Sequence, residues 1–242
     1  PSLGISAAGS TSNTPIISLR GQRPSESILT LDAAVSLYFA DVVMLPSHGT
    51  NLAMYDLSNV QVLKGPQGTL FGRNSTGGAV LMTPREAGDE LAGNVKLKVG
   101  DYGLVGGEFG VDIPANDRLR FRIAGKAVKR DGYQDNVATG DDEEFWDEDS
   151  SALRLTIDAD LSESLNNELI VDWSENNSTG RVPAPVAFNP SGGGVARLPD
   201  FLKGAFQAAV DAQVARDDWT KASTDILDAF ENVENLIVAN TT

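Results

Sequence analysis

From residue 89 onward, apolar and polar residues alternate in five short segments. Within each segment the apolar side chains recur at every second position, which is the period of a β-strand. The positions between them carry full charges of both signs, so each predicted strand has one apolar and one wet face. The apolar positions are Val95, Leu97 and Val99; Phe109, Val111 and Ile113; Leu119, Phe121 and Ile123; Leu153, Leu155 and Ile157; and Leu169, Val171 and Trp173.

The connections between these segments alternate in length. Residues 114–117 and 162–164 predict tight turns, whereas an acidic stretch over about 131–150 and a longer insertion from about 175 separate the other segments. Short turns at one end and long loops at the other are typical of outer-membrane β-barrels, whose inward positions are polar. A soluble β-sandwich would show the same alternation, so the pattern alone leaves both architectures open.

Two other regions follow different patterns. Residues 1–88 are rich in Gly, Ser and Pro, and short apolar runs within them predict a small mixed α/β domain. Its strands are expected at residues 3–5, 16–19, 35–39, 60–63 and 80–82. In the long insertion the apolar period becomes helical after a candidate N-cap at Asp200, and a second helical stretch is expected over residues 226–233. Residues 236–239 predict a sixth strand.

The amino-acid composition excludes several classes of function and of binding site. The chain has 242 residues, a formal net charge of −15, one histidine and no cysteine. Disulfides, thiolate metal sites and cysteine nucleophiles are therefore excluded, and the acidic balance argues against a nucleic-acid partner. No catalytic constellation is present, so we predict that the protein is not an enzyme and needs no cofactor.

The densest run of acidic residues occupies residues 141–149, which read DDEEFWDED. A charge run of this kind predicts a solvated loop. The run lacks the alternation and central glycine of a calcium-binding loop, so no metal is assigned to it.

Glycines cluster in residues 61–80, at positions 65, 68, 72, 77 and 78. This density indicates tight turns or backbone lying close to another surface. A phosphate-binding loop would place lysine and a hydroxyl residue directly after Gly77. Gly78 and Ala79 stand there instead, so the nucleotide-binding interpretation is rejected.

The sequence VLKGPQGTLFGRNSTGGAV within this stretch resembles the plug-domain signature of TonB-dependent outer-membrane receptors. Upstream, IISLRG and LYFADVVM…NLAMYDLSNVQVLKGP are similar to earlier plug segments in the same order.

The resemblance implies a mixed α/β plug followed by antiparallel transmembrane strands of a partial 22-stranded β-barrel. The plug would span residues 1–88 with its N-terminal part missing, and the start of the barrel residues 89–242. A helical extracellular loop would occupy about 176–232. An open sheet cannot sit in lipid, so we expect a piece of a longer polypeptide.

The resemblance also implies a function. Receptors of this family take up a scarce ligand across the bacterial outer membrane. The ligand class would be siderophore-iron, vitamin, haem or carbohydrate. The expected partners are this small molecule or metal chelate, outer-membrane lipid and a TonB-type energy transducer that binds a segment absent here. A signal-transducing receptor of the same architecture and a soluble β-rich binding or adhesion module are the alternatives.

Matching by position gives two sets of candidate residues in the plug. The first set would contact ligand at the plug apex and comprises Gln22, Arg23, Ser47, His48 and Asn51. The second set would hold the plug against acidic groups on the barrel wall and comprises Arg20, Lys64 and Arg73.

Overall fold

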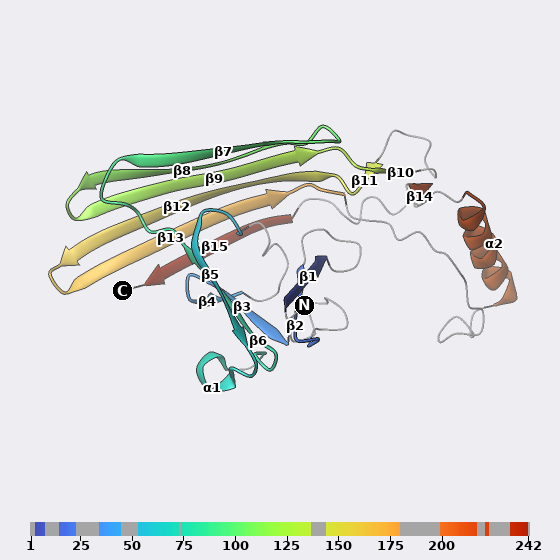
Figure 1. The fold of residues 1–242 in the computed structure, drawn as a ribbon, viewed down its shortest axis with the longest axis horizontal. Coiled ribbons are helices and arrows are strands. Elements are labelled where there is room, and N and C mark those ends of the chain that lie inside the picture. The colour runs from blue at the N-terminus through green and yellow to red at the C-terminus, as the bar shows by residue number, and fades with distance from the viewer. Residues whose placement is uncertain are drawn as a thin grey trace.

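The computed structural model describes residues 3–7, 15–22, 34–44, 53–72, 74–136, 144–179, 199–216, 221–222 and 233–241. A long six-stranded sheet dominates it, and a four-stranded sheet lies against one face of that sheet (Figure 1). The strand order of the long sheet is β15-β13-β12-β9-β8-β7, and every neighbouring pair is antiparallel. Its strands are β7 (Ala92–Val99), β8 (Val105–Asn116), β9 (Leu119–Arg130), β12 (Glu148–Ser162), β13 (Leu165–Asn176) and β15 (Val233–Thr241).

All five alternating segments of the sequence lie within these strands, and the sixth predicted strand is β15, so both predictions are confirmed. The connections after β7, β9 and β13 meet at one end of the sheet, which we call the long-loop end. The turns after β8 and β12 lie at the opposite, short-turn end (Figure 1).

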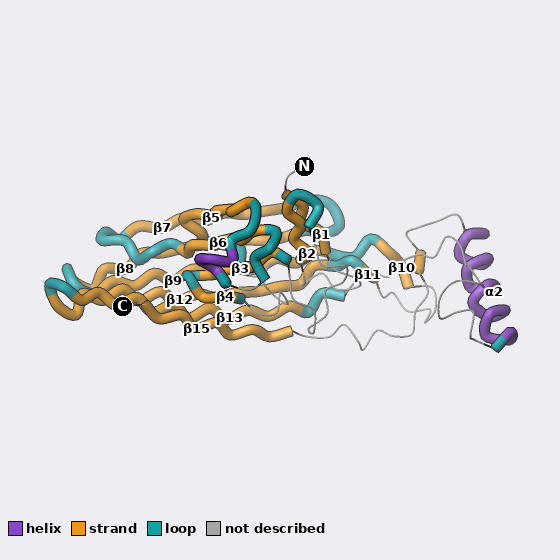
Figure 2. Tube along the Cα trace, turned by 90° about the horizontal axis from the view of Figure 1, so that it is seen from below, coloured by secondary structure: helices purple, strands orange, loops and turns teal. Residues whose placement is uncertain are grey.

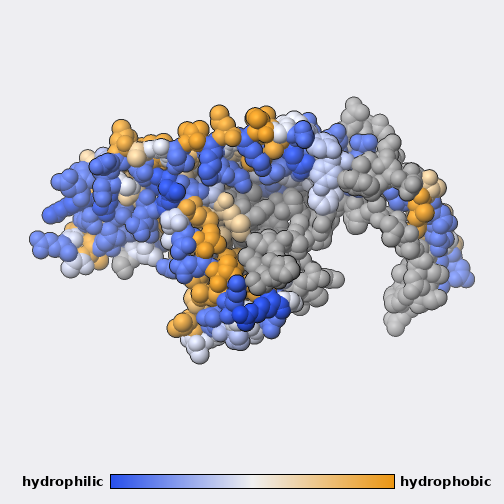
Figure 3. All heavy atoms as spheres, in the orientation of Figure 1, coloured by the Kyte–Doolittle hydropathy of each residue, from blue (hydrophilic) through white to orange (hydrophobic). Residues whose placement is uncertain are grey.

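The register of the six strands separates apolar and polar side chains. Val111, Ile123, Leu155, Val171 and Val238 form one row across five strands. They belong to the outer face, which also exposes large side chains such as Leu97 and Leu236 to solvent. Figure 3 shows apolar atoms along the ridge formed by the outer face. The inner face, which turns toward the four-stranded sheet, carries arginines, aspartates and small residues.

The four-stranded sheet has the order β4-β3-β6-β5, in which β3 and β6 are parallel and the other pairs antiparallel. Its strands are β3 (Val35–Phe39), β4 (Val42–Val43), β5 (Leu57–Lys64) and β6 (Gly78–Pro84), with a short helix α1 (Gly68–Phe71) between β5 and β6. A separate antiparallel pair joins β1 (Leu3–Ala7) to β2 (Pro15–Leu19). The strands predicted in residues 1–88 all form.

An apolar cluster joins the two sheets. Leu37 and Phe39 from β3 and Met82 from β6 are buried together with Ile170 and Ala239 from the inner face of the long sheet. The turned view in Figure 2 shows the four-stranded sheet lying across the strands of the long sheet. This contact fixes which face of the long sheet is covered.

Small elements cluster at the long-loop end. A three-stranded sheet contains β10 (Gln134–Asn136), β11 (Glu144–Phe145) and β14 (Lys221–Ala222), and helix α2 (Asp200–Arg216) lies beyond it (Figure 1). The predicted helix therefore exists and starts at Asp200, but its Phe201, Phe206 and Val214 side chains are exposed. A second helical stretch expected near residues 226–233 lies outside the described residues, apart from Val233 at the start of β15.

No helix among the described residues has both the length and the hydropathy needed to cross a membrane.

One glycine of the clustered stretch is sterically required. Gly78 has φ +144°, and a Cβ there would collide with the carbonyl oxygen of Leu63 and would lie 2.6 Å from the Cδ1 atom of Leu19. Replacing Gly78 with alanine should destabilise the four-stranded sheet by about 1–3 kcal/mol through backbone strain, with the collision in addition. Gly68→Ala is the matched control, because nothing lies within 4 Å of a Cβ there. Urea unfolding that finds both variants equally stable would contradict this account of Gly78.

Candidate functional site between the two sheets

The most heavily charged buried part of the structure is the junction between the two sheets. Residues 53–56, which lead into β5, lie against the inner face of β8, β9, β12 and β13. Two arginines of the long sheet, Arg122 in β9 and Arg154 in β12, reach across to this segment. We call this set of contacts the arginine clamp.

Arg154 is the most deeply buried member of the clamp, with 1% of its surface exposed. Its Nε donates a hydrogen bond of 2.8 Å to Oδ2 of Asp172, its neighbour on β13. Its Nη1 and Nη2 donate to the backbone carbonyl oxygens of Tyr55 and Ala53, each at 2.9 Å. The guanidinium therefore binds both a charge on its own sheet and the backbone of the other sheet.

Aromatic rings enclose the same guanidinium. The Cζ atom of Arg154 lies 4.3 Å from the ring centroid of Tyr55 and 4.7 Å from that of Phe39. Stacking of this kind adds a cation–π attraction, which is larger where water is excluded. Ala124 and Ala152 form a buried cluster with Tyr55, so small side chains of the long sheet leave room for its ring.

Tyr55 also donates a hydrogen bond to Asp172. Its O–H donates a hydrogen bond of 2.8 Å to Oδ2, the same oxygen that accepts from Arg154. Burial, followed by the nearby Asp172 carboxylate, raises the pKa of Tyr55 above its usual value. Tyr55 is therefore held as a neutral hydrogen-bond donor at physiological pH.

Arg122 forms the second half of the clamp with two aspartates. Its Nε and Nη2 donate to Oδ2 and Oδ1 of Asp56 at 2.7 and 2.6 Å, a bidentate pair, and its Nη1 donates to Oδ2 of Asp112 at 2.7 Å. Asp56 adopts φ 47°, a left-handed conformation that aspartate tolerates better than most residues. Gly110 is required beside this pair, because a Cβ there would collide with the Arg122 guanidinium.

Further contacts tie residues 88–89, which connect β6 to β7, to the inner face of the long sheet. The backbone N–H of Gly88 donates to Oδ1 of Asp112 at 3.0 Å. Nearer the short-turn end, Arg120 pairs with Asp89 at 2.9 Å, and with Asp158 and Asp160 at 3.1 and 3.3 Å. Residues 53–56 and 88–89 are thus both fixed to the long sheet by charged groups.

The residues predicted from sequence lie elsewhere or outside the described part of the chain. Gln22 is exposed and lies beside Gly77, and Arg20 and Lys64 are also exposed. Neither Arg20 nor Lys64 forms an ion pair with any residue that the structure describes. Arg23, Ser47, His48, Asn51 and Arg73 lie outside the described residues.

The buried cations of the clamp lie on the long sheet, and the predicted contacts of Arg20, Lys64 and Arg73 with acidic groups stay a prediction. Arg122 and Arg154 occupy polar positions of alternating segments, so their direction was predictable. Their partners were not, because Asp56 is 66 residues from Arg122.

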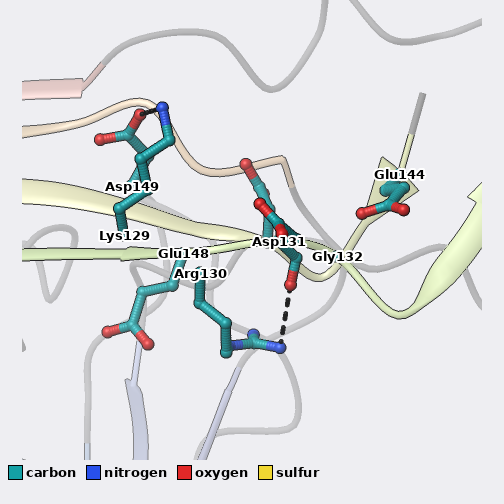
Figure 4. Close-up of a pocket in the computed structure, with 8 residues that line it drawn as sticks. Lys129, Arg130, Asp131, Gly132, Glu144, Glu148 and Asp149 are labelled. Carbon is teal, nitrogen blue, oxygen red and sulfur yellow. Dashed lines mark hydrogen bonds and ion pairs between the residues drawn. The ribbon is translucent and has the colours of Figure 1, made fainter. Parts of the chain in front are cut away.

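A separate hollow of about 220 Å³ lies at the long-loop end (Figure 4). It is lined by Lys129, Arg130, Asp131, Gly132, Glu144, Asp147, Glu148 and Asp149. Burial raises the pKa of Asp147, although Thr179 donates to its Oδ1 through both N–H and O–H. Among the described residues no group of acids or histidine is arranged to hold a metal ion. The hollow lies where the end of β9 meets β11 and the start of β12.

The sequence of this chain is similar to parts of two bacterial receptors. The pesticin receptor of Yersinia pestis is 30% identical over 144 residues, which are 59% of this chain and 21% of that receptor. The ferrioxamine B receptor of Salmonella typhimurium is 37% identical over 71 residues, covering 28% of this chain and 10% of that protein. This chain therefore spans about a fifth of the length of the first relative and less of the second. No family model matches the sequence.

Solved structures share the fold. The ferric yersiniabactin uptake receptor from Yersinia pestis superposes with a TM-score of 0.66 at 22% identity, over 74% of this chain and 28% of that one. The ferripyoverdine receptor of the outer membrane of Pseudomonas aeruginosa gives 0.56 at 17% identity, over 77% and 24%. The arrangement of a mixed sheet followed by an antiparallel sheet is common to all three chains.

Removing Arg154 should free residues 53–56 from the long sheet. The Arg154→Ala variant leaves the Asp172 carboxylate buried without its counter-ion, so we expect a loss of about 3–5 kcal/mol of unfolding free energy. Amide hydrogen exchange over residues 53–56 should rise with it. Arg118→Ala is the control, because Arg118 is exposed in the turn after β8. Equal protection of residues 53–56 in both variants would show that the clamp does not hold this segment.

Proposed function

Because this chain is a homologue of the TonB-dependent outer-membrane receptors, we propose that it forms the stopper and the first wall strands of an active importer. Receptors of this family are transporters rather than enzymes, which agrees with the prediction from the sequence. The four-stranded sheet, within residues 1–88, would be the plug, and residues 89–242 would begin the barrel. The connection over residues 177–232, with helix α2, would form an extracellular loop.

The arginine clamp is the observation that carries this proposal. Arg122 and Arg154 bury full charges against residues 53–56, on the polar face of a sheet whose other face exposes apolar side chains. A water-soluble β-sandwich would do the reverse, with apolar side chains inside and charges outside. A wall between lipid and a stoppered, polar interior has this polarity.

The edges of the long sheet support a larger assembly. Strands β7 and β15 each have one neighbour among the described strands, so each leaves a row of backbone groups unpaired. Unpaired backbone groups in lipid cost several kcal/mol each. We therefore infer that further strands of a longer polypeptide close the barrel between these two edges.

The ligand class follows from the relatives only as a proposal. One relative is named for ferrioxamine B, and two solved structures are named for ferric or ferri- compounds. An iron–siderophore chelate is therefore the ligand that we favour over vitamin, haem and carbohydrate. Outer-membrane lipid and a TonB-type energy transducer would be the partners, and Gln22, Arg23, Ser47, His48 and Asn51 stay candidate ligand contacts.

Uptake measurements test the transport proposal. Cells that lack other siderophore receptors would be given the whole receptor and radiolabelled ferrioxamine B or ferric yersiniabactin. Import of at least one chelate should require both the receptor and an active transducer, whereas surface binding should persist without the transducer. Import at an unchanged rate in transducer-deficient cells, or no import of any metal chelate, would contradict the proposal.

Permeability tests the stopper. If the arginine clamp keeps the plug seated, the double variant Arg122→Ala/Arg154→Ala should admit large antibiotics such as vancomycin, because the loosened plug leaves a water-filled path. Growth inhibition by vancomycin measures the leak, with Arg118→Ala as the control at equal amounts of receptor in the membrane. Equal resistance of the double variant and the control would argue against a plug held by these arginines.

A further inference from the structure

Three lysines line one part of the inner face that the clamp does not occupy. Lys96 and Lys98 lie on β7 and Lys126 lies on β9, all at inward positions of their strands. In the register, Lys96 stands opposite Glu108 of β8, and Glu108 stands opposite Lys126. We call Lys96, Lys98 and Lys126 the lysine strip.

The lysine strip lies between the clamp and the long-loop end. Arg122 stands opposite Asp112, and Glu108 is four residues closer to the long-loop end than Asp112 on the same face of β8. Lys98 is closer still, one residue before the last residue of β7. A molecule that enters from the long-loop end along the inner face would reach the lysine strip before it reaches the clamp.

Two of the three side chains of the strip are open to solvent, and the third, Lys126, is half-buried. Lys96 has 72% of its side chain exposed although it pairs with Glu108 at 3.1 Å, and Lys98 is exposed as well. Gly106 and Gly110 stand on either side of Glu108 on the same face of β8. Because glycine has no side chain, this stretch of the wall is a shallow surface from which the lysines project.

The charge of the strip is opposite to that of the chain. Three lysines and one glutamate leave a net charge of two positive units, whereas the chain carries −15. The cations of the clamp are already paired, since Arg122 binds Asp56 and Asp112. Glu108 is the one acid among the described residues that forms an ion pair with the lysine strip.

From this charge and position we propose that the lysine strip binds an anionic metal chelate on its way from the long-loop end to the plug. This inference rests on the proposed function and adds the charge of the ligand to it. Exposed lysines of one sign attract an oppositely charged ligand over about a Debye length and raise its association rate. The strip would select chelates whose donor groups leave a net negative charge, such as tris-catecholate complexes of Fe(III).

Binding to the purified whole receptor tests the assignment with two probes of opposite charge. Ferric enterobactin, a tris-catecholate complex, is anionic, whereas ferrioxamine B carries a free ammonium group. The triple variant Lys96→Gln/Lys98→Gln/Lys126→Gln removes the three charges and keeps polar side chains that are one atom shorter. It should bind ferric enterobactin about tenfold more weakly at low salt, lose most of the salt dependence of that binding, and not bind ferrioxamine B more weakly.

Lys129→Gln is the matched control. Lys129 lies on β9 like Lys126, but at an outward position where it pairs with Asp149, and 74% of its side chain is exposed. It should leave the affinity for ferric enterobactin unchanged. A triple variant that binds ferric enterobactin as the wild type does would overturn the inference.

The outcomes also separate this inference from the proposed function. A receptor that imports ferrioxamine B but does not bind ferric enterobactin would refute the lysine strip as an anion site and leave the importer proposal standing. A receptor that imports no metal chelate in energised cells would refute both.

Discussion

The arrangement of the two sheets depends on how the charge of Arg154 is buried. Moving a guanidinium out of water costs several kcal/mol, and the cost is recovered only when its donors are satisfied with good geometry. Asp172 supplies the counter-charge, the carbonyl oxygens of Ala53 and Tyr55 each accept one further N–H, and aromatic rings exclude water. Residues 53–56 are thus held to the long sheet by backbone carbonyl groups as well as by side chains.

The polarity of the long sheet explains why this contact is ionic. Its outer face is apolar, so the inner face receives the charges, and whatever lies against it must bring compensating polar groups. Charged groups can exchange a protein partner for water at modest cost, whereas separating an apolar interface always exposes apolar surface. The two sheets are held together by these arginine contacts and by the apolar contact of Phe39 with Ile170.

Close approach of backbone makes the contact possible. Gly110 leaves space for the Arg122 guanidinium. Ala124 and Ala152 do the same for the ring of Tyr55. Small residues therefore stand where the two sheets approach each other, and the large charged side chains fill the distance between them.

The sequence by itself determined the strands and their two faces, because alternation with a period of two is a local property of the chain. It placed Val111, Leu155 and Val171 on one face, and the glycine cluster near residues 65–78 indicated close backbone approach. Only the tertiary structure decided which charges meet. Arg154 and Tyr55 are 99 residues apart, and local patterns carry no information on contacts over that separation. The clamp emerges only when β9, β12 and β13 adopt their register and residues 53–56 come to lie on them, since ion pairing depends on distances of about 3 Å.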